Sequence, residues 1–180
     1  PLLADPGRRL SADSGARPMT RLALLLAGLF LLVRPALADF HAFGADSLAQ
    51  IETRRSGSDF VLVLWSVDCP PCLKELALFG TLKDARARQR LVLVVTDDPE
   101  RHAEADVLLK RFGLTDLEHW AFDATEPERL RQRIDPAWFG ELPRSYAYPA
   151  GQPRQARSGL IDAPTLARWL GTSLPTTARD

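Results

Sequence analysis

The chain has 180 residues, with 23 Lys and Arg against 23 Asp and Glu, so its formal net charge is zero. Hydrophobic residues make up 46% of the chain, enough to form a buried core. This balance argues against a nucleic-acid-binding protein, which needs basic residues clustered on one face.

The beginning of the chain has the layout of a secretory signal preceded by an extension. Met19 and a basic residue precede the apolar stretch 22–33, which is followed by a small-residue motif ending at Ala38. We predict that residues 1–18 are a disordered extension, that residues 19–38 are a signal peptide, and that cleavage follows Ala38. The apolar stretch is shorter than the roughly 20 residues that span a bilayer, so an uncleaved membrane anchor is the less favoured alternative. We therefore expect an exported, periplasmic protein.

Residues 39–180 are expected to form a single domain. They number 142, a size at which one chain can bury its own core. They carry 18 Lys and Arg and 21 Asp and Glu, which gives a net charge of −3. The basic residues Arg129, Arg131 and Arg133 of this domain are best explained as a solvated helix face.

The first half of the domain combines helical spacing with continuous apolar runs. Asp46-Ser47 precedes a short amphipathic pattern that ends at Ser56-Gly57, which predicts a helix. Residues 60–64 and 91–95 are fully apolar, as is typical of strands covered on both faces of a parallel sheet. Between these strands, residues 73–88 have helical spacing and predict one helix.

The second half continues the alternation of strands and helices. In chain order, we predict a helix from Pro99 to Gly113, a short strand at 119–122, a helical turn at 127–134, an antiparallel hairpin of strands 144–148 and 155–161, and a final helix at 165–170. This alternation is typical of an α/β fold.

The chain has two cysteines, Cys69 and Cys72, which stand just after the predicted strand 60–64. At the start of the helix that follows, unpaired backbone N–H groups and the helix dipole stabilise a thiolate. We therefore assign Cys69 as the nucleophile and Cys72, one turn inside, as the resolving thiol of a redox-active disulfide. A purely structural disulfide is disfavoured, because closing so short a loop gives little stabilisation.

Three side chains near the cysteines are candidates for tuning or for contact with a substrate. Asp68 directly precedes Cys69, and its negative charge would oppose thiolate formation and favour a reducing role. Glu75 lies three residues after Cys72 on the same helix face, where it would accept a proton from the resolving thiol or simply be solvated. Trp65 either covers the disulfide, where a substrate would touch it, or is a core aromatic.

The sequence VLWSVDCPPCLKE, from Val63 to Glu75, resembles the active-site segment of thioredoxin-fold proteins. More narrowly, it is similar to exported TlpA-like and ResA-like thiol-disulfide oxidoreductases, and the resemblance extends over residues 60–170. It implies a thioredoxin fold, in which a central mixed β-sheet is flanked by helices on both faces. It also implies that Pro143 is a cis proline facing the dithiol, and that the Leu142 backbone pairs with a bound substrate.

The resemblance implies an enzyme that reduces disulfides of client proteins, and cytochrome c maturation is a candidate process. It also implies a membrane electron donor that re-reduces the enzyme. We expect a monomer with no cofactor beyond its own disulfide. Two alternatives stay open: a dithiol oxidase or isomerase, and a copper-binding module of the same fold. For copper, the candidate ligands beyond the cysteines are His41, His102 and His119, but the cysteine spacing differs from that of copper-binding relatives, so we predict no metal.

Three aromatic residues of the later loops allow two interpretations. Trp120, Trp138 and Phe139 are either ordinary core residues or an apolar docking surface for a client. We predict the core role, because large aromatic side chains are mostly buried.

Overall fold

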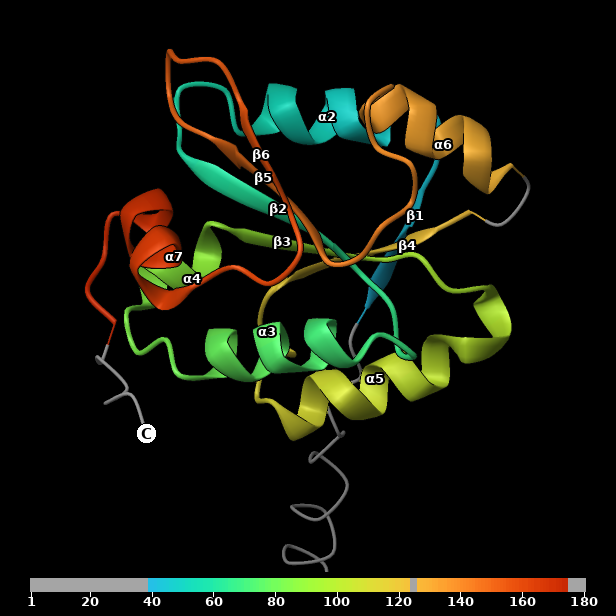
Figure 1. Ribbon diagram of the computed structural model, residues 1–180, viewed down its shortest axis with the longest axis horizontal. Coiled ribbons are helices and arrows are strands. Elements are labelled where there is room, and N and C mark those ends of the chain that lie inside the picture. The colour runs from blue at the N-terminus through green and yellow to red at the C-terminus, as the bar shows by residue number, and fades with distance from the viewer. Residues whose placement is uncertain (1–38, 124–125, 175–180) are drawn as a thin grey trace, which may run out of the picture. The chain divides into compact units, whose positions relative to one another are not determined.

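The computed structural model describes residues 39–123 and 126–174 (Figure 1). The predictions for residues 1–18 and 19–38, including cleavage after Ala38, concern residues outside these ranges. Within the described ranges, no helix is both long enough and apolar enough to cross a membrane.

Six strands form one mixed sheet in the described part of the chain. In chain order they are β1 (Phe40–Phe43), β2 (Phe60–Trp65), β3 (Leu91–Val95), β4 (Glu118–Phe122), β5 (Arg144–Tyr148) and β6 (Gln155–Ser158). Their order across the sheet is β1-β4-β3-β2-β5-β6. The first four in this order are parallel to one another, whereas β5 and β6 form the antiparallel end. Strand β1 was not predicted, because only one of its four residues is fully buried and its apolar pattern is weak.

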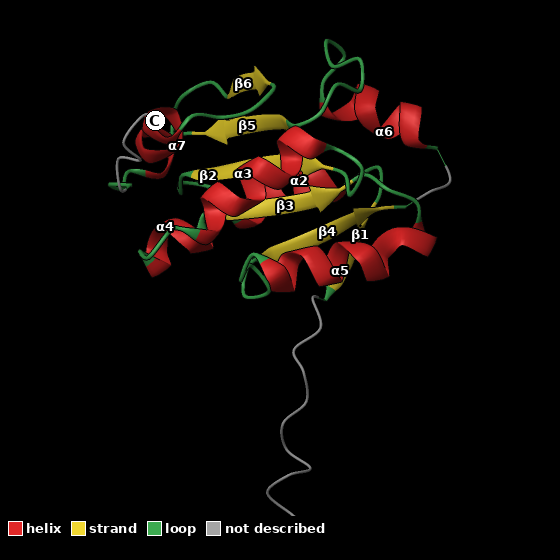
Figure 2. Cartoon of the chain, turned by 60° about the horizontal axis from the view of Figure 1, so that its bottom comes forward, coloured by secondary structure: helices red, strands yellow, loops and turns green. Residues whose placement is uncertain are grey.

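Helices cover both faces of the sheet, as predicted (Figures 1 and 2). In chain order they are α2 (Ser47–Arg54), α3 (Pro70–Gly80), α4 (Ala85–Gln89), the short 3-10 helix η1 (Pro99–Arg101), α5 (His102–Arg111), α6 (Pro127–Ile134) and α7 (Ala163–Leu170). Helices α2 and α6 pack on one face, and α3, α4, α5 and α7 pack on the other. The α/β prediction is therefore confirmed.

Strand β2 lies at the centre of the sheet and alternates between two core clusters. Val61 and Val63 face the cluster formed with α3, α5 and α7, whereas Leu62 and Leu64 face the cluster formed with α2 and α6. All four side chains are fully buried. Because β2 is packed from both sides, its C-terminal end is a rigid base for the segment that carries the cysteines.

The prediction of one helix over residues 73–88 is wrong, because the structure contains two. Helix α3 ends at Gly80, and Asp84 begins α4 by accepting hydrogen bonds from two N–H groups of its first turn at 2.8 and 3.4 Å. At Gly80 the main chain after α5 comes close: a β-carbon there would lie 2.5 Å from the carbonyl oxygen of Phe112. Apolar spacing alone does not reveal this contact between distant segments.

Candidate active site

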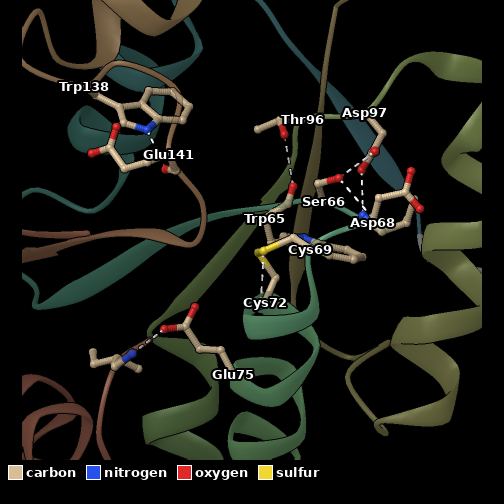
Figure 3. Close-up of a disulfide and its surroundings, with 12 residues drawn as sticks. Trp65, Ser66, Asp68, Cys69, Cys72, Glu75, Thr96, Asp97, Trp138 and Glu141 are labelled. Atoms are coloured by element: carbon tan, nitrogen blue, oxygen red, sulfur yellow. Dashed lines mark hydrogen bonds between the residues drawn. A yellow bond between two sulfur atoms is a disulfide. The ribbon is translucent and has the colours of Figure 1, made fainter. Parts of the chain in front are cut away.

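Cys69 and Cys72 form a disulfide where β2 leads into α3 (Figure 3). The S–S distance is 2.02 Å, and the two Cα atoms are 5.2 Å apart. Cys69 is the N-cap residue of α3, with extended backbone, and Pro70 and Pro71 occupy the first turn. The Cys69 sulfur accepts a hydrogen bond from the Cys72 N–H at 3.2 Å. The disulfide thus lies at the positive end of a helix dipole, as the sequence predicts.

The two cysteines differ in exposure. Cys72 is 1% exposed, whereas Cys69 is partly exposed. Exchange requires that a substrate sulfur approach the attacking sulfur directly. Cys69 is therefore the sulfur that a substrate can reach, and Cys72 lies behind it.

Asp97 follows β3 and fixes the segment between β2 and the disulfide. Its carboxylate accepts hydrogen bonds from the Ser66 hydroxyl at 2.8 Å and from the Val67 N–H at 2.9 Å (Figure 3). The next residue back, Thr96, donates its N–H to the Trp65 carbonyl at 2.9 Å. Sequence reasoning did not single out Asp97. The available signal was a polar residue at the carboxyl end of a parallel strand, the edge at which α/β proteins place their sites.

Asp68 forms an ion pair with Arg101 of η1. Both Arg101 terminal nitrogens bond to the carboxylate, one of them at 3.0 Å, and Arg101 also binds Glu104 at 2.7 Å. The hydrogen bonds from Arg101 lower the pKa of Asp68, so this carboxylate stays ionised at neutral pH. The charge next to Cys69 is therefore present, as predicted, but it is offset by a cation 33 positions along the chain.

Removing either member of this pair is expected to change the acidity of Cys69 in the reduced protein, in opposite directions. Arg101→Gln leaves the Asp68 charge uncompensated and should raise the thiol pKa, whereas Asp68→Asn should lower it. Because both side chains are exposed to solvent, which screens their charges, we expect the pKa of the Cys69 thiol to change by less than about one unit. The measurement is the ultraviolet absorbance of the thiolate as a function of pH.

The matched control for this experiment is Arg88→Gln, which breaks a comparable surface pair with Asp116 on another part of the domain. It should leave the Cys69 titration unchanged. Shifts of the same sign in the Asp68 and Arg101 variants would show that the pair does not act on Cys69 through its charges.

Glu75 is buried on α3, one turn beyond Cys72 (Figure 3). It is 1% exposed, and its Oε1 accepts a hydrogen bond from the Ile161 N–H at 2.9 Å. Its Oε2 has no hydrogen-bond partner among the described residues. Burial raises the pKa of Glu75 to about 7, and the Ile161 N–H and the charge of Arg157 oppose this rise. The solvated interpretation is therefore wrong, and Glu75 is a carboxyl group that can exchange a proton near neutral pH.

The Leu142–Pro143 peptide bond is cis, as the resemblance implies. Arg144 pairs with Leu64 in the antiparallel register of β5 and β2, so continuing the register by one residue places Pro143 beside Trp65. The cis proline thus lies at the end of β2 from which the cysteine segment starts. Among the described residues, no hydrogen bond involves the Leu142 main chain.

Trp65 is 1% exposed and belongs to the core cluster on the α3 face. Its carbonyl oxygen accepts hydrogen bonds from both the N–H and the hydroxyl of Thr96. This location favours the core interpretation of Trp65 over contact with a substrate.

The histidines are engaged elsewhere. The Nε2 atoms of His119 and His102 lie 2.9 and 3.3 Å from main-chain carbonyl oxygens, and His41 packs against the ring of Trp120. In the part of the chain that the structure describes, no group of three or more His, Cys, Asp or Glu side chains is placed to hold a metal ion.

No protein-family model matches this sequence, and no curated protein matches it. Several solved structures are similar to this chain. DsbF of Mycobacterium tuberculosis is 18% identical, with a TM-score of 0.52 over 76% of this chain and 96% of that one. A secreted disulfide oxidoreductase of the same organism, homologous to E. coli DsbE, is 16% identical, with a TM-score of 0.50 over 66% of this chain and 84% of that one.

A thiol:disulfide interchange protein of the thioredoxin family from Chlorobium tepidum is also similar. It is 15% identical, with a TM-score of 0.50 over 67% of this chain and 82% of that one. At these identities the similarity establishes the fold. The predicted architecture is confirmed: the chain has the thioredoxin fold.

Proposed function

We propose that this protein is an exported thiol-disulfide oxidoreductase of the TlpA-like and ResA-like kind, which reduces disulfides of client proteins. The observation that carries the proposal is a disulfide at the N-terminus of α3 with one reachable sulfur, Cys69, at the sheet edge that also holds a cis proline. The similarity to a secreted disulfide oxidoreductase and to a thiol:disulfide interchange protein supports the same chemistry.

In the proposed cycle the reduced protein attacks first. The Cys69 thiolate attacks one sulfur of the client disulfide, which breaks the client S–S bond, forms a mixed disulfide and releases one client thiolate that takes up a proton. Cys72 then gives its proton to Glu75, and its thiolate attacks the Cys69 sulfur. This step releases the second client thiolate and forms the Cys69–Cys72 disulfide. Two electrons pass from the dithiol to the client.

The cycle also requires binding of the client and re-reduction of the Cys69–Cys72 disulfide. An extended client segment would pair with the main chain of Leu142, next to Pro143, and so bring its sulfur to Cys69. The oxidised protein would be re-reduced by a membrane electron donor in the periplasm. We propose cytochrome c maturation as the process served, with the protein acting as a monomer.

The reduction potential tests the direction of electron flow. Strong dithiol oxidases owe their high potential to a stabilised thiolate in the reduced form. Here Arg101 and Asp68 offset each other, and two prolines remove N–H donors from the first turn of α3. We therefore expect a potential below about −220 mV, to be measured by equilibration with glutathione buffers and thiol alkylation. A value of about −120 mV is typical of a dithiol oxidase and would overturn the reductase assignment.

A further inference from the structure

Phe139 is the most exposed large hydrophobic residue in the described ranges, at 90%. The core prediction holds for Trp120 and Trp138, which are 6% and 3% exposed, but it is wrong for Phe139. A single exposed apolar side chain is common on protein surfaces. Whether the exposed Phe139 ring has a function depends on how its loop is held and on where the loop lies relative to the cysteines.

The loop of residues 135–142, which we call the Phe139 loop, is held by its own hydrogen bonds. The Trp138 N–H donates to the Asp135 carbonyl at 2.9 Å, and the Trp138 indole N–H donates to the Glu141 carbonyl at 2.8 Å. The Phe139 N–H itself donates to the Glu141 carboxylate at 3.1 Å. The main chain on both sides of Phe139 is thus fixed while its ring remains in solvent.

The Phe139 loop is also tied to the sheet directly behind the cis proline. Arg144, the first residue of β5, binds Asp135 at 2.7 Å and Glu141 at 3.3 Å, and both Arg144 and Asp135 are buried. The Ser158 hydroxyl donates to Glu141 at 2.6 Å. Because Arg144 directly follows Pro143, these contacts join the loop and the cis proline into one preorganised unit. Figure 3 shows Trp138 and Glu141 of this loop among the surroundings of the disulfide.

Two of the exposed large hydrophobic residues belong to segments that adjoin the cis proline in the chain or through its main-chain hydrogen bond. Phe139 precedes Pro143 by four residues. Leu160, which is 42% exposed, follows Gly159, whose N–H donates to the Pro143 carbonyl at 2.8 Å. The other large exposed hydrophobic side chain of the described ranges, Val107, lies on α5. Two of the three large exposed hydrophobic residues of the described ranges therefore lie on segments joined to the cis proline.

We propose that Phe139 is a client-binding residue, which contacts an apolar side chain of the client a few residues from its disulfide cysteine. This inference rests on the proposed function and extends it to the class of client sequence. The occupant is an extended polypeptide segment, because Leu142, whose main chain makes no hydrogen bond among the described residues, ends the Phe139 loop next to the cis proline and would pair with a strand there. An aromatic side chain on a fixed loop loses little conformational entropy on binding, which suits a recognition contact.

The test compares three substrates of the reduced protein: a peptide with one disulfide flanked by leucines, the same peptide with serines in place of the leucines, and a small aromatic disulfide without a peptide. Phe139→Ala should raise the KM for the leucine peptide about tenfold, since it removes the apolar contact. The kcat for this peptide, the rate with the small disulfide and the reduction potential should stay unchanged. The serine peptide should not distinguish Phe139→Ala from the wild type.

Two further variants serve as controls. Val107→Ala removes another exposed apolar side chain and should change none of these values, whereas Phe139→Leu should restore most of the affinity for the leucine peptide. Equal loss for both peptides in Phe139→Ala, or no loss for either, would overturn the inference while leaving the oxidoreductase function intact. A wild-type protein that fails to reduce even the small disulfide would overturn the proposed function, and the client contact with it.

Discussion

Replacing Cys69 by serine is expected to abolish reduction of a disulfide substrate. Cys69 is the partly exposed cysteine at the start of α3, and the other cysteine of the chain, Cys72, is 1% exposed, so Cys69 is the thiol placed to begin the exchange. A serine hydroxyl is a poor nucleophile toward sulfur and is not ionised near neutral pH. The measurement is turnover of a small aromatic disulfide and of insulin by the pre-reduced protein.

Cys72→Ser is expected to fail at the next step. Its Cys69 thiolate can still attack a client, but no second thiol is present to release the mixed disulfide. The variant should therefore accumulate a one-to-one covalent adduct with the substrate, visible by mass spectrometry under non-reducing conditions. The variant with both cysteines replaced by serine gives the background of the turnover assay and of the adduct assay. Adducts formed by Cys69→Ser and not by Cys72→Ser would exchange the two roles, and full turnover by either variant would refute the assignment.

The segment around the cysteines was predictable because its signals are local. The apolar run of β2 is buried on both faces, and the prolines after Cys69 are suited to the first turn of a helix. Two thiols three positions apart at this junction favour dithiol-disulfide exchange. The cis state of Pro143 came from the resemblance and not from local reasoning, because few X-Pro bonds are cis.

The unpredicted contacts around the cysteines depend on pairs of residues that are distant in the sequence. Glu75 binds an N–H group 86 positions away, and Arg101 binds Asp68 across 33 positions. Asp97 reaches back 30 positions to the Val67 N–H. No spacing rule predicts such pairs, because the fold has to bring their segments together first. The exposure of Phe139 was missed for a different reason: apolar character predicts burial, whereas local hydrogen bonds hold its loop with the ring in solvent.

Glu75→Gln is expected to make the oxidised protein more stable at alkaline pH. The Glu75 pKa is about 7 in the folded protein against an ordinary value of 4.5, so the folded state holds its proton more tightly than the unfolded state. The resulting stability is fully present below about pH 4.5 and is lost as the pH rises through about 7. The shift corresponds to roughly 3 kcal/mol. Glutamine is neutral throughout and keeps an acceptor for the Ile161 N–H.

The measurement is urea unfolding of the oxidised wild type and of Glu75→Gln at several pH values. Other groups titrate alike in both proteins, so the difference between the two free energies of unfolding isolates Glu75. This difference should move in favour of the variant by up to roughly 3 kcal/mol between about pH 4 and about pH 9. A difference that does not change with pH would show that Glu75 has an ordinary pKa in the folded protein.

The same substitution should slow the release of the client from the mixed disulfide. Without a carboxylate to accept the Cys72 proton, we expect this step to be about a hundredfold slower near neutral pH, while the first attack by Cys69 keeps its rate. In the wild type the release rate should rise as Glu75 ionises around pH 7; in Glu75→Gln it should rise only when the thiol itself ionises, at higher pH. Stopped-flow mixing with a fluorescent disulfide peptide separates the two steps.

If Glu75 had only a structural role, Glu75→Gln would change the stability and the release rate in a different way. Both quantities are therefore measured on this one variant. If the carboxyl group served the fold, its removal would lower the stability and leave the pH profile of the release step in place. Burial of an ionised carboxylate is unfavourable, and carboxyl groups with pKa values raised in this way cluster at functional sites. We therefore expect Glu75→Gln to be both more stable at alkaline pH and slower. A more stable variant with an unaltered release rate would remove Glu75 from the mechanism.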